Sequence, residues 1–341
     1  MIRAAQIGLG WWGKTLVESV QGTSDVIQFV AAASRTQTDD YKAFCAQHGL
    51  TFHQTFEQAL ADPQVDAVVL ATPHSLHSPQ VIAAAKAKKH VFCEKPFALT
   101  KADAQAAVDA TTQAGVTLGL GYNRRFHPEM TRLRDQIRSG ELGTILHVEA
   151  TMTFPNGLFL KPDAWRADKH ETPCGALTPM GVHAIDGMID LCGPIDHVYC
   201  QSFRRVVEVD SDDTTSMLFR LKSGASGYLG TLTAIGPGFS FQVFGSKGWV
   251  RMEGMTHVAG ASSEERRTRL FSTIKFQPIK GPAEVWEAAR HDVTRACLEA
   301  FGAAASGGTP FLIPTDEMIH GASVTEAVVK SAASGVVEKV A

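Results

Sequence analysis

Three short motifs carry the side chains best suited to chemistry: Gly8-Leu9-Gly10-Trp11-Trp12-Gly13, Glu94-Lys95-Pro96 and Gly181-Val182-His183. The glycine motif follows the apolar run Ile2–Ile7 and precedes a predicted helix over Lys14–Gln21. In that context Gly8 allows a tight turn, Gly10 lets a pyrophosphate approach the backbone, and Gly13 lets helix pack on strand. The free N–H groups and dipole of a helix N-terminus favour the phosphates. The motif, with Trp11 and Trp12 beside the pocket, therefore predicts a dinucleotide site.

Lys95 and His183 are the candidate proton-transfer groups. Lys95 follows the predicted strand at His90–Cys93, close to where a nicotinamide ring would lie. A cationic ring nearby lowers the pKa of a lysine, and a lysine so tuned can exchange a proton with a substrate hydroxyl while hydride moves. A neutral imidazole such as that of His183 can donate to or accept from a hydroxyl near pH 7. The simpler alternatives are a solvated loop lysine and a core histidine bonded to a backbone carbonyl.

The end of the second predicted strand decides the cofactor. An NAD site usually has an acidic residue about 20 residues past the glycine turn, where it binds the ribose 2′-OH. This chain has Ser34-Arg35-Thr36 there. Arg35 can pair with a 2′-phosphate and stack on adenine, and the two hydroxyls can donate hydrogen bonds. We therefore expect NADP, with NAD as the alternative.

The elements that must position these residues alternate in the first third of the chain. Strands are predicted at Ile2–Ile7, Val26–Ala33, Val65–Ala71, His90–Cys93 and Val116–Tyr122, and helices at Asp39–His48 after Thr38, Pro79–Lys89 and Thr100–Ala114. Strands separated by helices predict a doubly wound parallel sheet, with ligands at the carboxyl ends of the strands. We therefore place an α/β dinucleotide-binding domain of Rossmann type at residues 1–124.

The pattern changes after residue 144, where strand-like runs follow one another with short turns. They lie at Ile145–Thr153, His197–Val206, Thr214–Leu221, Ser226–Ala234, Phe241–Phe244 and Trp249–Met252. One helix is predicted near Gly181–Leu191, and two close the chain, near Ala283–Ala305 and Thr315–Ser334. This pattern predicts an α+β domain at residues 125–341 with a large, open, mostly antiparallel sheet. The last helices are free to pack back on the first domain.

Composition excludes several classes of function. The chain has 341 residues, 44% hydrophobic and 20% charged, with a formal net charge of −3. These values fit a two-domain globular protein and argue against nucleic-acid or membrane partners. Six scattered cysteines with no C-x-x-C pair, and no signal-peptide pattern, predict free thiols and a cytoplasmic protein.

Four motifs in this order resemble the Gfo/Idh/MocA oxidoreductases, which include glucose–fructose oxidoreductase and inositol dehydrogenases. They are the glycine motif, Ala71-Thr72-Pro73-His74-Ser75-Leu76-His77, Glu94-Lys95-Pro96, and Gly175-Ala176-Leu177 running to Gly181-Val182-His183-Ala184-Ile185-Asp186. The resemblance covers almost the whole chain. It implies a Rossmann domain, an open-sheet domain, and homodimers or homotetramers packed through that sheet. It also implies a catalytic Lys95 with His183 beside it, and commonly a cis Lys95–Pro96 bond.

The resemblance places further side chains at the ligands. Cofactor contacts are expected from Thr72, Pro73, His74, His77, Glu94, Lys95, Asn123, Trp165 and Arg166. Substrate contacts are expected from Lys95, Tyr122, Arg125, Trp165, Arg166 and His183. For Trp165 and Arg166 the alternative is a surface stack, and for Arg124 and Arg125 a salt bridge at the domain joint. His74 and His77 have metal-ligand spacing, but no third ligand is near them in sequence, so we expect no metal.

One position departs from the family pattern. Many members carry Asp four residues before the histidine, and this chain has Pro179, which can neither orient His183 nor share a proton. Asp186, one helical turn later, can orient His183, although a structural role is the simpler interpretation.

The expected activity is hydride transfer, with NADP preferred, to or from a sugar, polyol or related small hydroxy or keto compound. A transient oxidation coupled to elimination, and a non-catalytic dinucleotide-binding regulator, are the alternatives. The sequence leaves the substrate and the reaction direction open.

Overall fold

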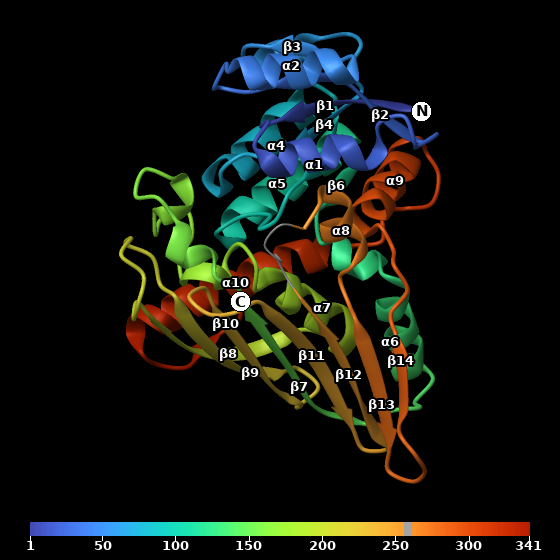
Figure 1. Cartoon of the computed structure of the whole chain (residues 1–341), viewed down its shortest axis with the longest axis vertical. Helices are drawn as coiled ribbons and strands as arrows, with labels where there is room; N and C mark the ends of the chain where they lie inside the picture. The colour runs from blue at the N-terminus through green and yellow to red at the C-terminus, as the bar shows by residue number, and fades with distance from the viewer. Residues whose placement is uncertain (256–260) are drawn as a thin grey trace. The chain divides into compact units, whose positions relative to one another are not determined.

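The computed structural model describes residues 1–255 and 261–341, which divide into two compact units (Figure 1). Unit 1 comprises Met1–Asn123 and Thr294–Ile319, and unit 2 comprises Arg124–Val293 and His320–Ala341. In the described part of the chain, no helix is both long enough and apolar enough to cross a membrane.

Unit 1 is built on a parallel sheet, as predicted, and its six strands, which include the unpredicted β3, lie in the order β3-β2-β1-β4-β5-β6. Its strands are β1 (Ile2–Ile7), β2 (Ile27–Ala33), β3 (Thr51–His53), β4 (Ala67–Leu70), β5 (His90–Cys93) and β6 (Leu118–Leu120). The chain winds outward in both directions from the adjacent strands β1 and β4. A ligand is expected outside the carboxyl ends of the strands at such a switch in strand order.

Helices pack on this sheet, and their starts follow local sequence signals. They are α1 (Trp11–Val20), α2 (Asp39–His48), α3 (Phe56–Ala61), α4 (His77–Lys86), α5 (Lys101–Ala114) and α9 (Val293–Ala305). Thr38 and Thr100 accept hydrogen bonds from backbone N–H groups of α2 and α5, confirming both predicted N-caps. The Phe301 ring of α9 contacts Phe92 of β5 edge to face, with ring centroids 5.6 Å apart. The helix therefore completes the core of unit 1 although it comes late in the sequence.

Unit 2 is built on a nine-stranded sheet in the order β14-β13-β12-β11-β7-β10-β9-β8-β15. Its strands are β7 (Ile145–Thr153), β8 (Ile195–Phe203), β9 (Thr214–Leu221), β10 (Ser226–Leu232), β11 (Gly238–Gly245), β12 (Gly248–Gly254), β13 (Thr273–Pro278), β14 (Glu284–Glu287) and β15 (Glu338–Lys339). Every pair is antiparallel except β7 with β10, which run parallel. The predicted α/β fold with a mostly antiparallel second sheet is therefore confirmed.

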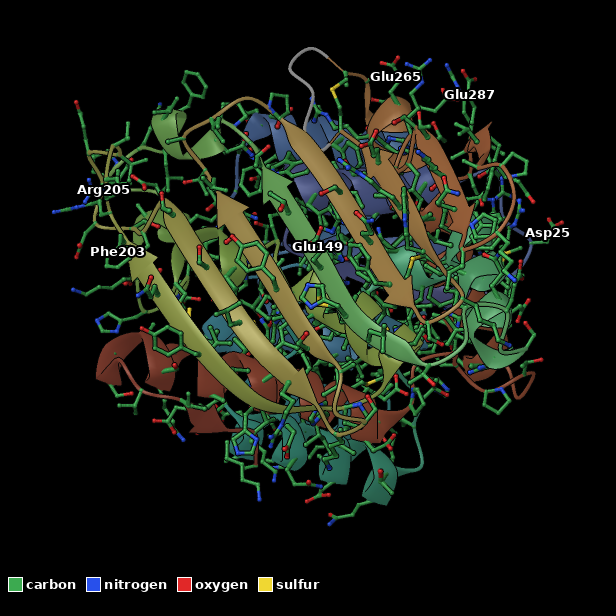
Figure 2. All side chains as sticks on the ribbon, turned by 90° about the horizontal axis from the view of Figure 1, so that it is seen from below. Asp25, Glu149, Phe203, Arg205, Glu265 and Glu287 are labelled. Atoms are coloured by element: carbon green, nitrogen blue, oxygen red, sulfur yellow. The ribbon has the colours of Figure 1, made fainter. Side chains whose placement is uncertain are left out.

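The core of unit 2 lies on one face of this sheet. The helices of this unit are α6 (Pro128–Arg138), α7 (Val182–Cys192), α8 (Ser263–Thr268) and the part of α10 (Thr315–Ser334) that begins at His320. Met188 of α7 and Val328 of α10 are fully buried in the same apolar cluster as the inward side chains of the strands. Side chains alternate along β7, so Glu149 belongs to the opposite face, which Figure 2 shows without a helix over it.

The predicted helix over Ala283–Ala305 is wrong over its first ten residues. Residues Glu284–Glu287 form β14, which pairs antiparallel with β13, and the helix begins only at Val293. The reason is the side chain of Trp286, which packs against the core of unit 2 and donates its indole N–H to Glu129 at 3.0 Å. Tertiary contacts of one aromatic residue thus outweigh the local helical preference.

Candidate active site

The glycine turn after β1 is held by close packing. Gly8 has a φ of +90°, and a Cβ there would lie 2.5 Å from the Ala71 carbonyl oxygen. A Cβ on Gly13 would overlap the Gly8 carbonyl oxygen. The buried Gln6 amide donates to that same carbonyl oxygen at 3.1 Å. Two glycines of the motif are therefore required by the protein itself, whatever ligand is bound.

Gly10 differs from its two neighbours in the motif. A Cβ on Gly10 would meet no atom within 4 Å, so packing inside the protein does not require a glycine at this position. Gly10 is also the N-cap of α1, and as a glycine it has no side chain that could cap the first turn of that helix. Open space over exposed backbone N–H groups is what a pyrophosphate requires, so these residues fit a dinucleotide. Trp11 and Trp12 form the first turn of α1, with ring centroids 5.3 Å apart.

The end of β2 presents the residues expected to select the cofactor. Ser34 is half-buried, whereas Arg35 and Thr36 are exposed. The Gln37 amide donates to the Ser34 carbonyl oxygen at 3.0 Å and so shapes this turn. No carboxylate occupies residues 34–36, and Asp40 on α2 forms an ion pair with Lys14 at 2.6 Å.

The loop after β4 contains Thr72, Pro73 and His74, and α4 begins at His77. Thr72 Oγ1 donates to Gln80 Oε1 at 2.6 Å. The two histidine rings contact each other edge to face, 5.9 Å between centroids, and both are buried. His77 directs Nδ1 at the Pro96 carbonyl oxygen (2.7 Å) and Nε2 at the Thr72 carbonyl oxygen (3.0 Å). In the described residues, no group of three or more His, Cys, Asp or Glu side chains could hold a metal.

The loop after β5 carries Glu94 and Lys95 at the same edge of the sheet. Glu94 is 5% exposed, and its carboxylate accepts a hydrogen bond from the Lys95 backbone N–H at 3.3 Å. Burial raises the pKa of the Glu94 carboxyl, while the charge of Lys95 and the Trp12 indole oppose that rise. Lys95 is half-buried, and its bond to Pro96 is cis.

After β6, Gly121 and Tyr122 continue this edge. A Cβ on Gly121 would lie within 3 Å of the Glu94 carboxyl group, so only glycine leaves room for that side chain. Tyr122 is 3% exposed. The Asn123 amide donates to Thr294 Oγ1 at 3.2 Å. Unit 1 therefore brings together the glycine turn and the predicted residues that follow β2, β4, β5 and β6.

His183 lies in unit 2, in the first turn of α7, and is 8% exposed. The turn before it is tight, because a Cβ on Gly181 would lie 2.9 Å from the Leu177 backbone. Pro179 lies in that turn. Trp165 and Arg166 belong to a short helical turn, η4 (Trp165–Ala167), with the guanidinium 4.1 Å from the indole centroid.

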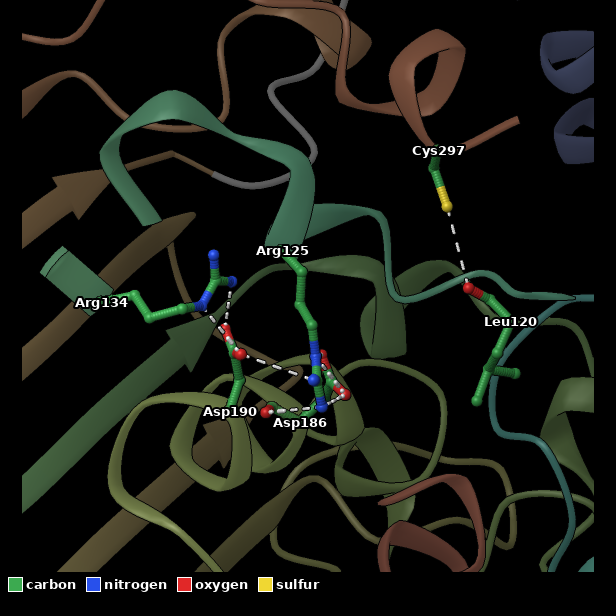
Figure 3. Close-up of polar contacts among 6 residues, drawn as sticks. All are labelled: Leu120, Arg125, Arg134, Asp186, Asp190 and Cys297. Carbon is green, nitrogen blue, oxygen red and sulfur yellow. Dashed lines mark hydrogen bonds and ion pairs between the residues drawn. The ribbon is translucent and has the colours of Figure 1, made fainter. Parts of the chain in front are cut away.

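Arg125 and Asp186 form a buried ion pair that fixes α7 in unit 2 (Figure 3). Arg125 Nη2 lies 2.6 Å from Asp186 Oδ1, and Nε lies 2.9 Å from Oδ2. Asp190, one turn further along α7, binds Arg134 of α6 at 2.6 Å and lies 3.5 Å from Arg125. This network was not predicted as a unit. Asp186 holds the helix that carries His183, whereas a contact of Arg125 with substrate stays a prediction.

Arg124, which the sequence suggested only for a salt bridge, stacks on an aromatic ring. Its guanidinium is 4.6 Å from the Phe239 ring centroid, and burial lowers its pKa to about 9. A salt bridge was the alternative role expected of these arginines, and Arg125 forms one with Asp186, but nothing in the sequence indicates that partner or the stacking of Arg124.

Comparison with known proteins identifies the family. A sequence model described as "Oxidoreductase family, NAD-binding Rossmann fold" matches residues 2–122, and one described as "GFO/IDH/MocA C-terminal domain" matches residues 130–251. The chain belongs to the Gfo/Idh/MocA oxidoreductase family. Membership agrees with the open space beside Gly10, and the members that it resembles are NAD(P)-dependent oxidoreductases.

Individual relatives of this Gfo/Idh/MocA protein act on small polyhydroxy compounds, by their names. Myo-inositol 2-dehydrogenase of Thermotoga maritima is 29% identical over 278 residues, which is 79% of this chain and 80% of that protein. D-xylose 1-dehydrogenase [NADP(+)] of Haloarcula marismortui is 30% identical over 54% of this chain and 52% of its own. The structure of aldose-aldose oxidoreductase from Caulobacter crescentus, complexed with glycerol, is 25% identical, with a TM-score of 0.84 and coverage of 99% of both chains.

Proposed function

We propose that the protein is an NADP-preferring oxidoreductase that transfers a hydride to or from a hydroxyl or carbonyl carbon of a sugar, polyol or related small molecule. The observation that carries this proposal is the half-buried Lys95 at the same sheet edge as the open backbone of Gly10. A proton-transfer group and a dinucleotide cradle on one edge are what hydride transfer requires. The names of the relatives support the substrate class.

The cofactor would be held by backbone and side chains of unit 1. The N–H groups around Gly10 would bind the pyrophosphate, with Trp11 and Trp12 beside it. Residues after β4 and β6, with Trp165 and Arg166 of unit 2, are the further predicted contacts. When bound, the nicotinamide supplies the hydride acceptor or donor.

Lys95 carries the proton transfer in this proposal. Its amine takes the proton of the substrate hydroxyl during oxidation and returns it during reduction. His183 assists through hydrogen bonds to the substrate, as the family resemblance implies. Because Pro179 cannot orient His183, Lys95 carries the larger share.

The preference for NADP rests on the end of β2. Arg35 is exposed, and residues 34–36 include no carboxylate that could bind the ribose 2′-OH, as an acidic residue does in an NAD site. A guanidinium at this position favours a 2′-phosphate by charge-assisted hydrogen bonding.

We further infer a cytoplasmic homodimer or homotetramer that packs through the open sheet face of unit 2. That face combines charged residues such as Glu149 with the aromatic rings of Tyr199, Tyr228, Phe244 and Trp249. Aromatic residues among polar ones are typical of protein interfaces.

The test is turnover of NADP or NADPH with a panel of sugars, inositols and keto-sugars, using native protein, Lys95→Ala and Lys86→Ala. Lys86 is exposed in the last turn of α4 and serves as the matched control. We expect Lys95→Ala to lose about 100-fold or more in rate while keeping NADP affinity, because a positioned acid–base group contributes that much. Lys86→Ala should match the native protein.

Three results would contradict the proposal. Native-like turnover by Lys95→Ala would give this residue a structural role. Product formation without net change in NADPH would indicate transient oxidation. Tight NADP binding without turnover of any compound would favour a regulator.

A further inference from the structure

We propose that His77 is a positioning residue that holds the Lys95–Pro96 loop with one ring nitrogen and the Thr72 loop with the other. The inference rests on the proposed function of Lys95 as the proton-transfer group. It concerns a side chain that lies behind the loops rather than among the reacting groups. His77 is 1% exposed and occupies the first position of α4.

The ring joins two loops at the point where their strands end. Strands β4 and β5 pair in parallel as far as Leu70 and Cys93, and the Glu94 N–H donates to the Leu70 carbonyl oxygen at 2.9 Å. Beyond this bond the two segments leave the sheet: the segment with Thr72 leads to α4, and the segment with Lys95 leads to α5. His77 Nε2 then lies 3.0 Å from the Thr72 carbonyl oxygen, and Nδ1 lies 2.7 Å from the Pro96 carbonyl oxygen.

Each contact has a separate consequence. The Pro96 carbonyl is in the residue after Lys95, so the Nδ1 contact fixes the backbone from which the Lys95 side chain extends. The Thr72 carbonyl is in the loop that abuts the glycine turn, where Gly8 packs against Ala71. The Nε2 contact therefore holds a wall of the predicted cofactor site. A displacement of about 1 Å at a reacting group can lower a rate by about 100-fold.

Carbonyl oxygens accept hydrogen bonds only, so each nitrogen must donate to make its contact, and both hydrogen bonds form together only when the imidazole ring carries a proton on each nitrogen. This allows the two contacts to be removed one at a time. An Asn amide reaches about as far from the backbone as Nδ1, and a Gln amide about as far as Nε2. His77→Asn keeps a donor for Pro96 alone, and His77→Gln keeps a donor for Thr72 alone.

The experiment measures kcat, the Kd for NADP and the rate at which reductive methylation modifies Lys95, read by mass spectrometry. We expect His77→Gln to lower kcat about tenfold or more and to change Lys95 methylation about threefold, with NADP affinity retained. We expect His77→Asn to weaken NADP binding about threefold or more, with kcat and Lys95 methylation close to native. Thermal unfolding establishes that both variants are folded.

His90→Asn is the matched control. His90 lies at the other end of β5, and its Nδ1 accepts a hydrogen bond from the Thr117 N–H at 3.0 Å. An Asn oxygen can accept that bond, so kcat, Kd and Lys95 methylation should stay within about twofold of native.

Parallel losses of kcat and NADP affinity in both His77 variants would overturn the proposal, because they indicate general damage rather than two separate contacts. Native-like behaviour of both variants would overturn it as well. Lys95 methylation distinguishes a failure of the proposed function. If Lys95→Ala turns over normally but methylation still responds to His77→Gln alone, the loop contact stands and the catalytic role of Lys95 does not.

Discussion

Replacing Asp186 by Asn should destabilise unit 2 by about 3–5 kcal/mol, because the change leaves a buried guanidinium without its main counter-ion. The side chains of Arg125 and Asp186 are 2% and 4% exposed. Arg125 Nε lies 3.0 and 2.9 Å from the two carboxylate oxygens, and Nη2 lies 2.6 Å from one of them. An Asn of the same shape keeps one acceptor, but its NH₂ group faces a guanidinium that only donates.

The remaining carboxylate cannot replace the lost charge. Asp190 lies 3.5 Å from Arg125 Nη1 and already binds Arg134 at 2.6 Å. For a domain the size of unit 2, 3–5 kcal/mol corresponds to a fall of about 10 °C in the midpoint of thermal unfolding. Scanning calorimetry of native protein and variants measures this shift directly.

The control is Asp210→Asn in the same unit. Asp210 lies 3.2 Å from Lys169, with both side chains more than half exposed, so its loss should cost less than about 1 kcal/mol. The double variant Arg125→Met with Asp186→Leu should recover most of the loss, because apolar residues remove both buried charges together. If Asp186→Asn shifts the midpoint no more than Asp210→Asn does, the buried pair does not hold α7 as we argue.

Three further outcomes are expected. Arg35→Ala should weaken NADP binding about tenfold or more and leave NAD binding unchanged, as measured by fluorescence titration. Equal affinities of the native protein for NADP and NAD would refute this prediction. His183→Asn should lower the rate much less than Lys95→Ala, and pH–rate profiles in which both variants are equally impaired would make His183 the main base. Burial, with the charge of His291, lowers the pKa of His127 to about 4, below its unfolded value of about 6.5. The neutral ring therefore stabilises the folded protein above pH 6.5, and about 3 kcal/mol of this stabilisation is lost as the pH falls toward 4. The free energy of unfolding, measured with urea, should decrease with falling pH across this range, and it should decrease less in His127→Phe.

Local signals predicted the sheet of unit 1 and most of the residues at the carboxyl edge of its strands. The glycine motif, the N-caps Thr38 and Thr100, and the polar residues after β4 and β5 all depend on neighbours in the sequence. The helix α6 also had local signals, a capping residue at His127 followed by Pro128 at the first helical position, which we did not recognise.

What the sequence could not show are the contacts between residues far apart along the chain. Arg125 and Asp186 are separated by 61 positions, and nothing in either motif indicates that they pair. The parallel pairing of β7 with β10 in an otherwise antiparallel sheet is a matter of topology rather than of pattern. The sequence predicts helix where β14 lies, because the partners of Trp286, which are Glu129 and the core of unit 2, lie outside its own segment.

Residues that take no part in the proposed reaction also determine the geometry of the candidate site. Glu94 belongs to a motif, but its buried position depends on Gly121, where any side chain would come within 3 Å of the carboxyl group. Lys95 belongs to the same motif, and its loop is held through the carbonyl oxygen of Pro96 by His77. The motif therefore specifies which groups are present, while residues from α4 and β6 determine where those groups lie. Substitution of such residues should alter rate and affinity separately, because each one supports a different loop of the same edge.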